Sequence, residues 1–267
     1  MKIDWTKAEI RFVINQYKKG HSRHSIAKLF KQYFNIERSH NSIKHCIDTY
    51  GAEVEKNLPK VLLLDVETKP KKAWVWGSYD QNVGTEMLIE DGAILSWSAK
   101  WLGDPENKVI YKDQRGNEKN LLNDKKLMQP LRDLLDDADI VIWQNGDSFD
   151  YGEINNRLIE HEIEPPSPYK TIDTVKIARK HFRFFTNKLA HMTAKFCKKY
   201  KKQDHKMFPG FSMWDECMKG NVKAWNCMKE YNKFDVLSLE ELFLVLARYA
   251  KGDPKVAAAM RTYNAKK

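Results

Sequence analysis

The sequence predicts an α/β fold, with a mixed sheet flanked by helices, preceded by a small all-α domain of three helices. Residues 1–52 show helical periodicity and turn signals. From residue 60 onward, short runs of aliphatic residues are typical of buried strands. Polar turns and amphipathic helices follow these runs, as they do in α/β folds.

Capping signals predict three short helices in residues 1–52. Thr6 and Glu9 form a capping box ahead of a helical apolar stripe. Ser22 and Ser39 can cap a second and a third helix, and we expect the third helix to end at Tyr50-Gly51.

The periodicity changes after residue 52, which sets the expected domain organisation. A short polar stretch containing Leu58 and Pro59 predicts a linker at residues 53–59. We therefore expect a helical domain at residues 1–52, an α/β domain at residues 60–250 and a C-terminal tail at residues 251–267.

Four short segments of the helical domain carry a resemblance: Trp5-Thr6-x-x-Glu9, Gly20-x-Ser22, Ile26-Ala27-x-Leu29 and Arg38-Ser39-x-x-Ser42-Ile43. They make the domain similar to the Myb/SANT-like and homeodomain-like helix-turn-helix modules. Such modules place their DNA contacts near the start of the third helix. The resemblance implies DNA contacts from five residues there: Arg38, His40, Asn41, Lys44 and His45. A helical module that docks another protein is the alternative.

The aliphatic run at residues 60–67 predicts a buried strand that ends in two acids, Asp65 and Glu67. Because side chains alternate along a strand, both carboxylates point to one face and can grip one metal ion. A strand that merely ends in solvated acids is the alternative.

We expect further strands near residues 73–78, 93–101, 107–112 and 140–143. The tryptophans of this region should pack against the sheet: Trp74, Trp76, Trp97, Trp101 and Trp143.

A polar turn and an amphipathic helix follow the strand predicted at residues 140–143. Asp150 falls at this strand-to-helix crossing, at the carboxyl edge of the sheet where α/β folds build their sites. Asn145 would hold the turn or touch substrate. The alternative for Asp150 is a helix cap, a common role for aspartate.

One long helix, or two that nearly join, is predicted over residues 221–249. Tyr231 and Asp235 lie four residues apart on one face. The alternative is that Tyr231 packs with its hydroxyl outward and Asp235 is solvated. The chain thus holds four carboxylates in apolar settings, and such groups repel one another unless a cation neutralises them. Divalent metal ions and hydrolysis of a phosphodiester are the chemistry that this pattern predicts.

The three segments also carry a resemblance of their own. Asp65-x-Glu67, Asn145-x-x-x-Phe149-Asp150 and Tyr231-x-x-x-Asp235 resemble, in order and spacing, the three Exo motifs of the DEDD 3′–5′ exonuclease superfamily. A tyrosine four residues before the last aspartate is typical of the DEDDy branch. Asn187-Lys188-Leu189-x-x-Met192 and Trp214 look like the proofreading domains of family B DNA polymerases and their stand-alone relatives. The resemblance covers about residues 60–250 and implies an RNase H-like fold.

The resemblance implies a role for each site residue. Asp65 would bridge two Mg²⁺ or Mn²⁺ ions, and Glu67 and Asp235 would complete one metal site. Asp150 would hold the second ion, and Tyr231 would orient the attacking water. The substrate-binding residues would be Asn145, Phe149 and Lys188.

The charge of the chain points to its partner. A net charge of +10 and a pI near 9.2 favour a polyanion. A basic run after the second motif predicts a surface that binds the phosphates of a single strand, and a merely solvated surface is the alternative. The run consists of Lys195, Lys198, Lys199, Lys201, Lys202 and Lys206.

No segment is apolar enough for a signal core or a membrane span, and four widely spaced cysteines favour a reducing compartment. We expect a cytoplasmic protein of a bacterium or a phage-infected cell, with no membrane partner.

These patterns together predict a metal-dependent 3′–5′ exonuclease with two Mg²⁺ or Mn²⁺ ions, acting on DNA in preference to RNA. An exoribonuclease that trims RNA stays open, because the 2′-hydroxyl is sensed by local contacts. A catalytically silent nucleic-acid-binding protein is the other alternative.

Overall fold

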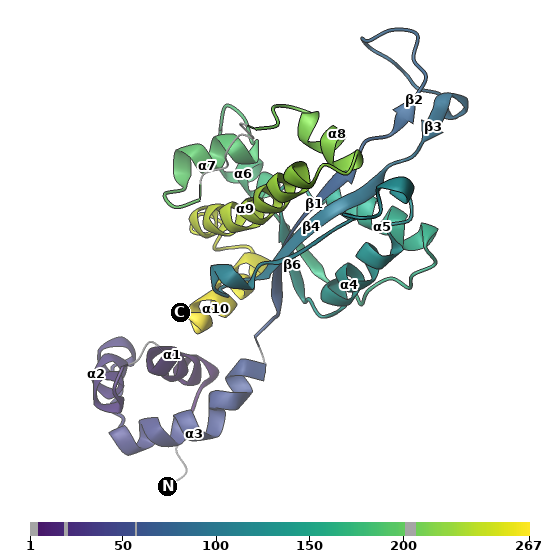
Figure 1. The fold of residues 1–267 in the computed structure, drawn as a ribbon. Helices are drawn as coiled ribbons and strands as arrows, with labels where there is room; N and C mark the ends of the chain where they lie inside the picture. Colours follow the sequence, from purple (N-terminus) through teal and green to yellow (C-terminus); the bar gives the residue numbers. More distant parts are fainter. Residues whose placement is uncertain (1–4, 19–20, 57, 201–206) are drawn as a thin grey trace.

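The computed structural model of the protein describes residues 5–18, 21–56, 58–200 and 207–267. Within these residues, three helices precede a five-stranded mixed sheet that carries helices on both faces (Figure 1). The predicted α/β fold with a leading all-α unit is confirmed.

The N-terminal unit consists of α1 (Lys7–Lys18), α2 (Arg23–Phe34) and α3 (His40–Lys56). Thr6 and Glu9 form the predicted capping box, because the Thr6 N–H donates to the Glu9 carboxylate at 2.7 Å and the Glu9 N–H to the Thr6 hydroxyl at 3.2 Å. The core of the unit is a small buried cluster: Val13, Ile26, Phe30, Ile43 and Cys46. Gly20, which the resemblance used, lies outside the described residues.

Helix α3 runs through the position where we expected it to end. Gly51 keeps a negative φ, so it does not adopt the left-handed conformation that closes a helix. A Cβ at Gly51 would come within 3.8 Å of Ile14, which places this glycine against α1. The helix therefore continues to Lys56 and takes up half of the predicted linker.

The main sheet has the strand order β5-β4-β1-β6-β7. Strand β1 pairs antiparallel with β4 and parallel with β6, β6 pairs parallel with β7, and β4 pairs antiparallel with β5. The strands are β1 (Val61–Lys69), β4 (Ala93–Trp101), β5 (Ile110–Asp113), β6 (Ile140–Trp143) and β7 (Lys170–Asp173). Four match predicted strands, β4 and β6 with the expected bounds. Strand β7 was missed, because four residues with one buried aliphatic side chain leave no strand pattern.

Side chains alternate along β1 between two apolar cores. Leu62 and Leu64 pack toward α4 (Lys125–Asp136) and α5 (Asp150–Glu160). Val61 and Leu63 pack toward the core that holds α9 (Val222–Leu246). That second core also takes side chains from α6 (Thr174–His181), α7 (Leu189–Phe196) and α10 (Pro254–Lys266). Because Asp65 and Glu67 continue the series of Val61 and Leu63, they face α9.

The remaining elements are short. Helix α8 (Ser212–Met218) packs on α9. Single 3₁₀ turns lie at η1 (Thr85–Met87), η2 (Glu106–Lys108) and η3 (Glu118–Asn120). In the part of the chain that the structure describes, no helix is both long and apolar enough to cross a membrane.

The strand predicted at residues 73–78 is wrong in its extent and in its packing. Only β2 (Lys72–Ala73) forms, and it pairs with β3 (Leu88–Glu90) in a separate two-stranded ribbon. Trp74 and Trp76 are 72% and 96% exposed, so they do not pack on the sheet. The alternation of aromatic and small residues is typical of a strand, but among the residues that the structure describes no layer lies beside this segment to bury Trp74 and Trp76.

Candidate functional site

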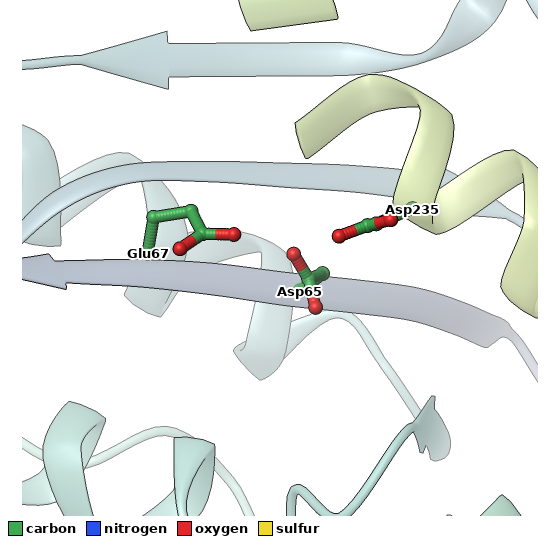
Figure 2. A group of neighbouring side chains, drawn as sticks. All are labelled: Asp65, Glu67 and Asp235. Atoms are coloured by element: carbon green, nitrogen blue, oxygen red, sulfur yellow. The ribbon is translucent and has the colours of Figure 1, made fainter. Parts of the chain in front are cut away.

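Three carboxylates from separate parts of the chain meet on one face of the sheet. Each of Asp65, Glu67 and Asp235 offers an oxygen, and these oxygens all lie within 4.8 Å of one another. Asp65 and Glu67 stand on β1, and Asp235 approaches them from α9 (Figure 2). The structure thus brings together three of the four carboxylates that the sequence singled out.

Neighbouring polar groups hold two of these carboxylates in place. The buried Asn232 donates from its amide nitrogen to the Asp65 Oδ2 at 2.5 Å, and it accepts from the Ser96 hydroxyl at 3.3 Å. The indole N–H of Trp214 donates to the Glu67 Oε2 at 3.2 Å. Both donors orient a carboxylate.

The chemistry of this cluster fits a divalent cation. Carboxylates this close repel one another unless a positive charge lies between them. Carboxylate oxygens are the ligands that Mg²⁺ and Mn²⁺ prefer. Asp65, Glu67 and Asp235 therefore form a donor set suited to such an ion.

Asp150 lies beside the cluster, at the open edge of β1. Strand β6 pairs with β1 only as far as Leu63, and beyond that point Asp150 accepts the Val66 N–H at 3.2 Å. Asp150 begins α5 and is 5% exposed. Burial raises the pKa of this carboxyl group to about 7, and the charges of Asp173 and Glu153 raise it too. A nearby cation would favour the charged form of this carboxyl group.

The turn between β6 and α5 is fixed by Asp173. Its carboxylate accepts the N–H of Asn145 at 3.0 Å, of Asp147 at 3.3 Å and of Val175 at 2.8 Å. Asn145 has a φ of 63°, which an asparagine tolerates better than most residues. A Cβ on Gly146 would come within 2.2 Å of the Trp143 ring, so only glycine fits there. The turn that leads into Asp150 is therefore rigidly held.

Two of the predicted substrate-binding residues, Asn145 and Lys188, line one cleft of about 690 Å³. Arg179 also lines it, which adds a second cationic side chain. Phe149 is 42% exposed next to Asp150 and is not among the residues that line this cleft. Phe149 therefore does not share this cleft with Asn145 and Lys188.

Tyr231 lies one helical turn before Asp235 on α9 and reaches the site through Trp214. The two rings meet edge to face with centroids 6.0 Å apart, and Trp214 donates to Glu67. Trp214 comes from α8, so this helix completes the wall of the site beside β1 and α9.

The predicted DNA-contact residues of the N-terminal unit divide into two groups. His40, Asn41, Lys44 and His45 are all exposed in the first turns of α3, and His40 stacks on His24 with centroids 4.6 Å apart. Arg38 has a structural contact instead. Its guanidinium pairs with Glu9 at 3.3 Å and lies 4.6 Å from the Trp5 ring, and its side chain is 16% exposed.

The basic run after the second motif is only partly described. Lys195, Lys198 and Lys199 are exposed. Lys199 forms an ion pair with Glu106, so it is engaged at the surface. The other members, Lys201, Lys202 and Lys206, lie outside the described residues.

Sequence reasoning missed two residues of the site. Asn232 sits on the buried face of α9, and an asparagine on an apolar helical face was the signal that could have found it. The second is Asp173, which caps α6 and also holds the turn at Asn145. Nothing in the sequence alone links Asp173 to that turn, because the contact depends on the pairing of β6 with β7.

Comparison with known proteins gives three findings. Residues 99–247 match the profile described as the RNase_H superfamily, a range that includes Asp150 and Asp235 and begins after β1. The DNA polymerase III PolC-type of Ureaplasma parvum serovar 3 is 26% identical over 171 residues, which cover 58% of this chain and 11% of the polymerase.

The third finding is a solved structure, the family B DNA polymerase from the hyperthermophilic archaeon Pyrobaculum calidifontis. It is similar over 75% of this chain and 27% of the polymerase, with 12% identity and a TM-score of 0.48. The chain therefore spans a small part of either polymerase.

Proposed function

The chain belongs to the RNase_H superfamily, and we propose that it is a metal-dependent 3′–5′ exonuclease of the DEDDy type that hydrolyses phosphodiester bonds of DNA. The observation that carries the proposal is the meeting of Asp65, Glu67 and Asp235 within 4.8 Å. Carboxylate oxygens gathered this closely are a donor set that Mg²⁺ and Mn²⁺ prefer, which supports a metal-dependent activity.

The carboxylates would divide two Mg²⁺ or Mn²⁺ ions between them. Asp65, Glu67 and Asp235 would hold one ion, and Asp150, with Asp65, would hold the second. Bound divalent cations supply a stronger water nucleophile and stabilise charge on the leaving 3′-oxygen. Asn232 and Trp214 would keep the ligands oriented, which is the usual work of groups one contact removed from a metal.

The other site residues would position water and substrate. The Tyr231 hydroxyl would orient the attacking water, one helical turn from Asp235. Lys188 and Arg179 would offset the charge of phosphates that enter the cleft beside Asn145. Phe149, exposed beside Asp150, would contact the terminal nucleotide.

Two observations support DNA as the substrate. The chain is 26% identical, over 171 residues, to a protein named as a DNA polymerase. Its net charge of +10 favours a polyanion. The N-terminal unit would bind duplex DNA through the exposed start of α3, in the manner of a helix-turn-helix module.

A cleavage assay on purified protein tests the proposal. The substrates are 5′-labelled single-stranded DNA, duplex DNA and RNA, each with Mg²⁺, Mn²⁺ or EDTA. We expect a metal-dependent ladder that shortens from the 3′ end of DNA. The Asp65→Ala variant should lose this activity and keep most of its DNA affinity. A ladder from RNA alone would move the assignment to an exoribonuclease.

The absence of cleavage from any substrate, with binding retained, would contradict the enzymatic proposal and favour a silent binding protein. Loss of both cleavage and binding in Asp65→Ala, with the fold intact, would contradict the metal role given to Asp65.

A further inference from the structure

An arm of the chain, which we define as residues 69–91, projects past the end of the main sheet (Figure 1). It contains β2, η1 and β3 and connects β1 to β4. The arm begins two residues after Glu67, so both of its ends lie at the edge of the sheet that carries the carboxylate cluster.

The base of the arm is held firmly. Lys69 is 2% exposed, and its ammonium donates to the carbonyl oxygens of Asp91 at 2.9 Å and Pro70 at 3.3 Å and pairs with Glu90 at 2.9 Å. Lys72 reaches the other oxygen of Glu90 at 2.9 Å. A buried ammonium is tolerated only when its hydrogen bonds are made, so these contacts fix the direction in which the arm leaves the sheet.

The far part of the arm exposes large aromatic side chains. Trp74, Trp76 and Tyr79 are 72%, 96% and 86% exposed. Folding gains almost nothing from tryptophans left in water, and a group of exposed aromatic residues marks a contact with something else. Ile89 and Val75 widen this apolar surface.

The charges of the arm indicate what that contact is. Residues 73–89 contain no lysine or arginine, and their charged side chains are Asp80 and Glu86. Such a surface repels phosphates, so a nucleic acid would meet it through the faces of its bases. Aromatic rings stack on unpaired bases of any sequence.

We propose that the arm is a stacking platform for unpaired bases of the strand whose 3′ end lies in the carboxylate site. This inference rests on the proposed nuclease function, because a strand lies beside the arm only when its 3′ end is bound at the carboxylate cluster. It assigns a second binding surface to the enzyme, separate from the cleft of Asn145 and Lys188. Together, the cleft would take phosphates and the arm would take bases.

The length of chain between site and platform sets the size of substrate that can use both. Trp76 lies nine residues after Glu67, so the two Cα atoms are at most about 32 Å apart. A single strand of several nucleotides can cover any distance up to that limit, and so can occupy the site and the arm together.

Two measurements on the full-length chain test the platform and the nuclease separately. The first is the affinity for a 12-nucleotide single strand in EDTA, measured by fluorescence anisotropy, for wild type and for the double variant Trp74→Ala/Trp76→Ala. The second is the metal-dependent hydrolysis of the p-nitrophenyl ester of thymidine 5′-monophosphate, a substrate with a single nucleotide and no further base to stack on the arm.

We expect the double variant to bind the 12-mer at least about 5-fold more weakly, the lower end of the range for a single lost stacking contact. This fold-change should be the same at low and high salt, because no phosphate contact is removed. Trp74→Phe/Trp76→Phe should restore most of the affinity, and Val83→Ala, on the same arm, should leave it unchanged. An abasic 12-mer should bind wild type and double variant alike.

Unchanged affinity of the double variant, or an equal loss with the abasic strand, would overturn the platform. Ester hydrolysis decides the nuclease independently. We expect wild type and double variant to hydrolyse the ester equally. A wild type that does not hydrolyse the ester would count against the proposed function. The binding result would still decide whether the arm is a stacking platform.

Discussion

At the scale of single residues, the site depends on side chains that never need to touch a substrate. Asn232 is fully buried on α9 and donates to Asp65 at 2.5 Å, so it ties the Asp65 carboxylate on β1 to the helix that carries Asp235. Trp214 does the same for Glu67 from α8. The three carboxylates therefore meet because three different elements are joined through polar contacts as well as through the core.

Replacing Asn232 with alanine should weaken metal binding. The change removes the donor that orients Asp65, and losses of this kind reduce metal affinity about 10- to 100-fold. We expect the Mg²⁺ concentration for half-maximal cleavage to rise by such a factor, with a smaller change at saturating Mg²⁺. Ser238→Ala is the control, because it removes a buried hydroxyl of the same helix that donates to the Asp235 carbonyl oxygen. Equal effects of the two variants would contradict an orienting role for Asn232.

The buried Asp150 should make the metal-free protein sensitive to pH. Its folded pKa of about 7 lies above the ordinary 3.8, so the native state favours the neutral acid. The stabilisation from this group is complete below about pH 4 and is lost as the pH rises through 7. In EDTA, wild type should lose about 3 kcal/mol more stability between pH 5 and pH 8 than Asp150→Asn does.

Denaturant unfolding of both proteins at the two pH values measures this difference. Addition of Mg²⁺ at pH 8 should recover stability in the wild type, because the cation favours the charged carboxylate. An identical pH dependence in wild type and Asp150→Asn would contradict this role of Asp150.

At the scale of elements, the features that local patterns determine could be predicted from the sequence. The aliphatic runs of β4 and β6 predicted the observed bounds, and the capping box of α1 formed as expected. The four-residue spacing of Tyr231 and Asp235 was enough to predict that both lie on one face of a helix. The sequence could not predict that Arg38 turns inward to Glu9 and Trp5, nor that Trp74 and Trp76 stay exposed. Those outcomes depend on which surfaces lie nearby after folding.

The turn between β6 and α5 gives an element-scale prediction through two glycines. Gly146→Ala should destabilise the protein by about 1–3 kcal/mol and lower activity, because its Cβ would overlap the Trp143 ring and shift the start of α5. Gly152→Ala should stabilise it by about 0.5–1 kcal/mol, because it lies in α5 with nothing within 4 Å of the added Cβ. Thermal unfolding compares the pair. Stabilisation by both changes would show that the turn adapts.

At the scale of the whole molecule, the protein joins two units of different chemistry. The α/β unit holds the carboxylate cluster, the cleft lined by Asn145 and Lys188, and the arm. The helical unit exposes His40, Asn41, Lys44 and His45 on α3. We interpret the helical unit as a duplex-binding module that brings the nuclease to DNA, and a protein-docking module is the alternative that experiment decides.

A charge change on α3 tests this division of labour. Lys44→Gln should weaken binding to duplex DNA and reduce the slope of log affinity against log salt concentration by about 1. It should leave cleavage of a short single strand unchanged. Lys28→Gln on α2, also exposed, is the matched control and should change neither. Unchanged duplex affinity in Lys44→Gln would favour protein docking.

Anomalous diffraction from crystals soaked in Mn²⁺ is the decisive measurement for the metal centre. We expect a manganese peak among the carboxylates of Asp65, Glu67 and Asp235 in the wild type, and its loss in Asp65→Ala. Crystals that show no manganese at these three residues, or an unchanged peak in the variant, would contradict the assignment of the cluster as a metal centre.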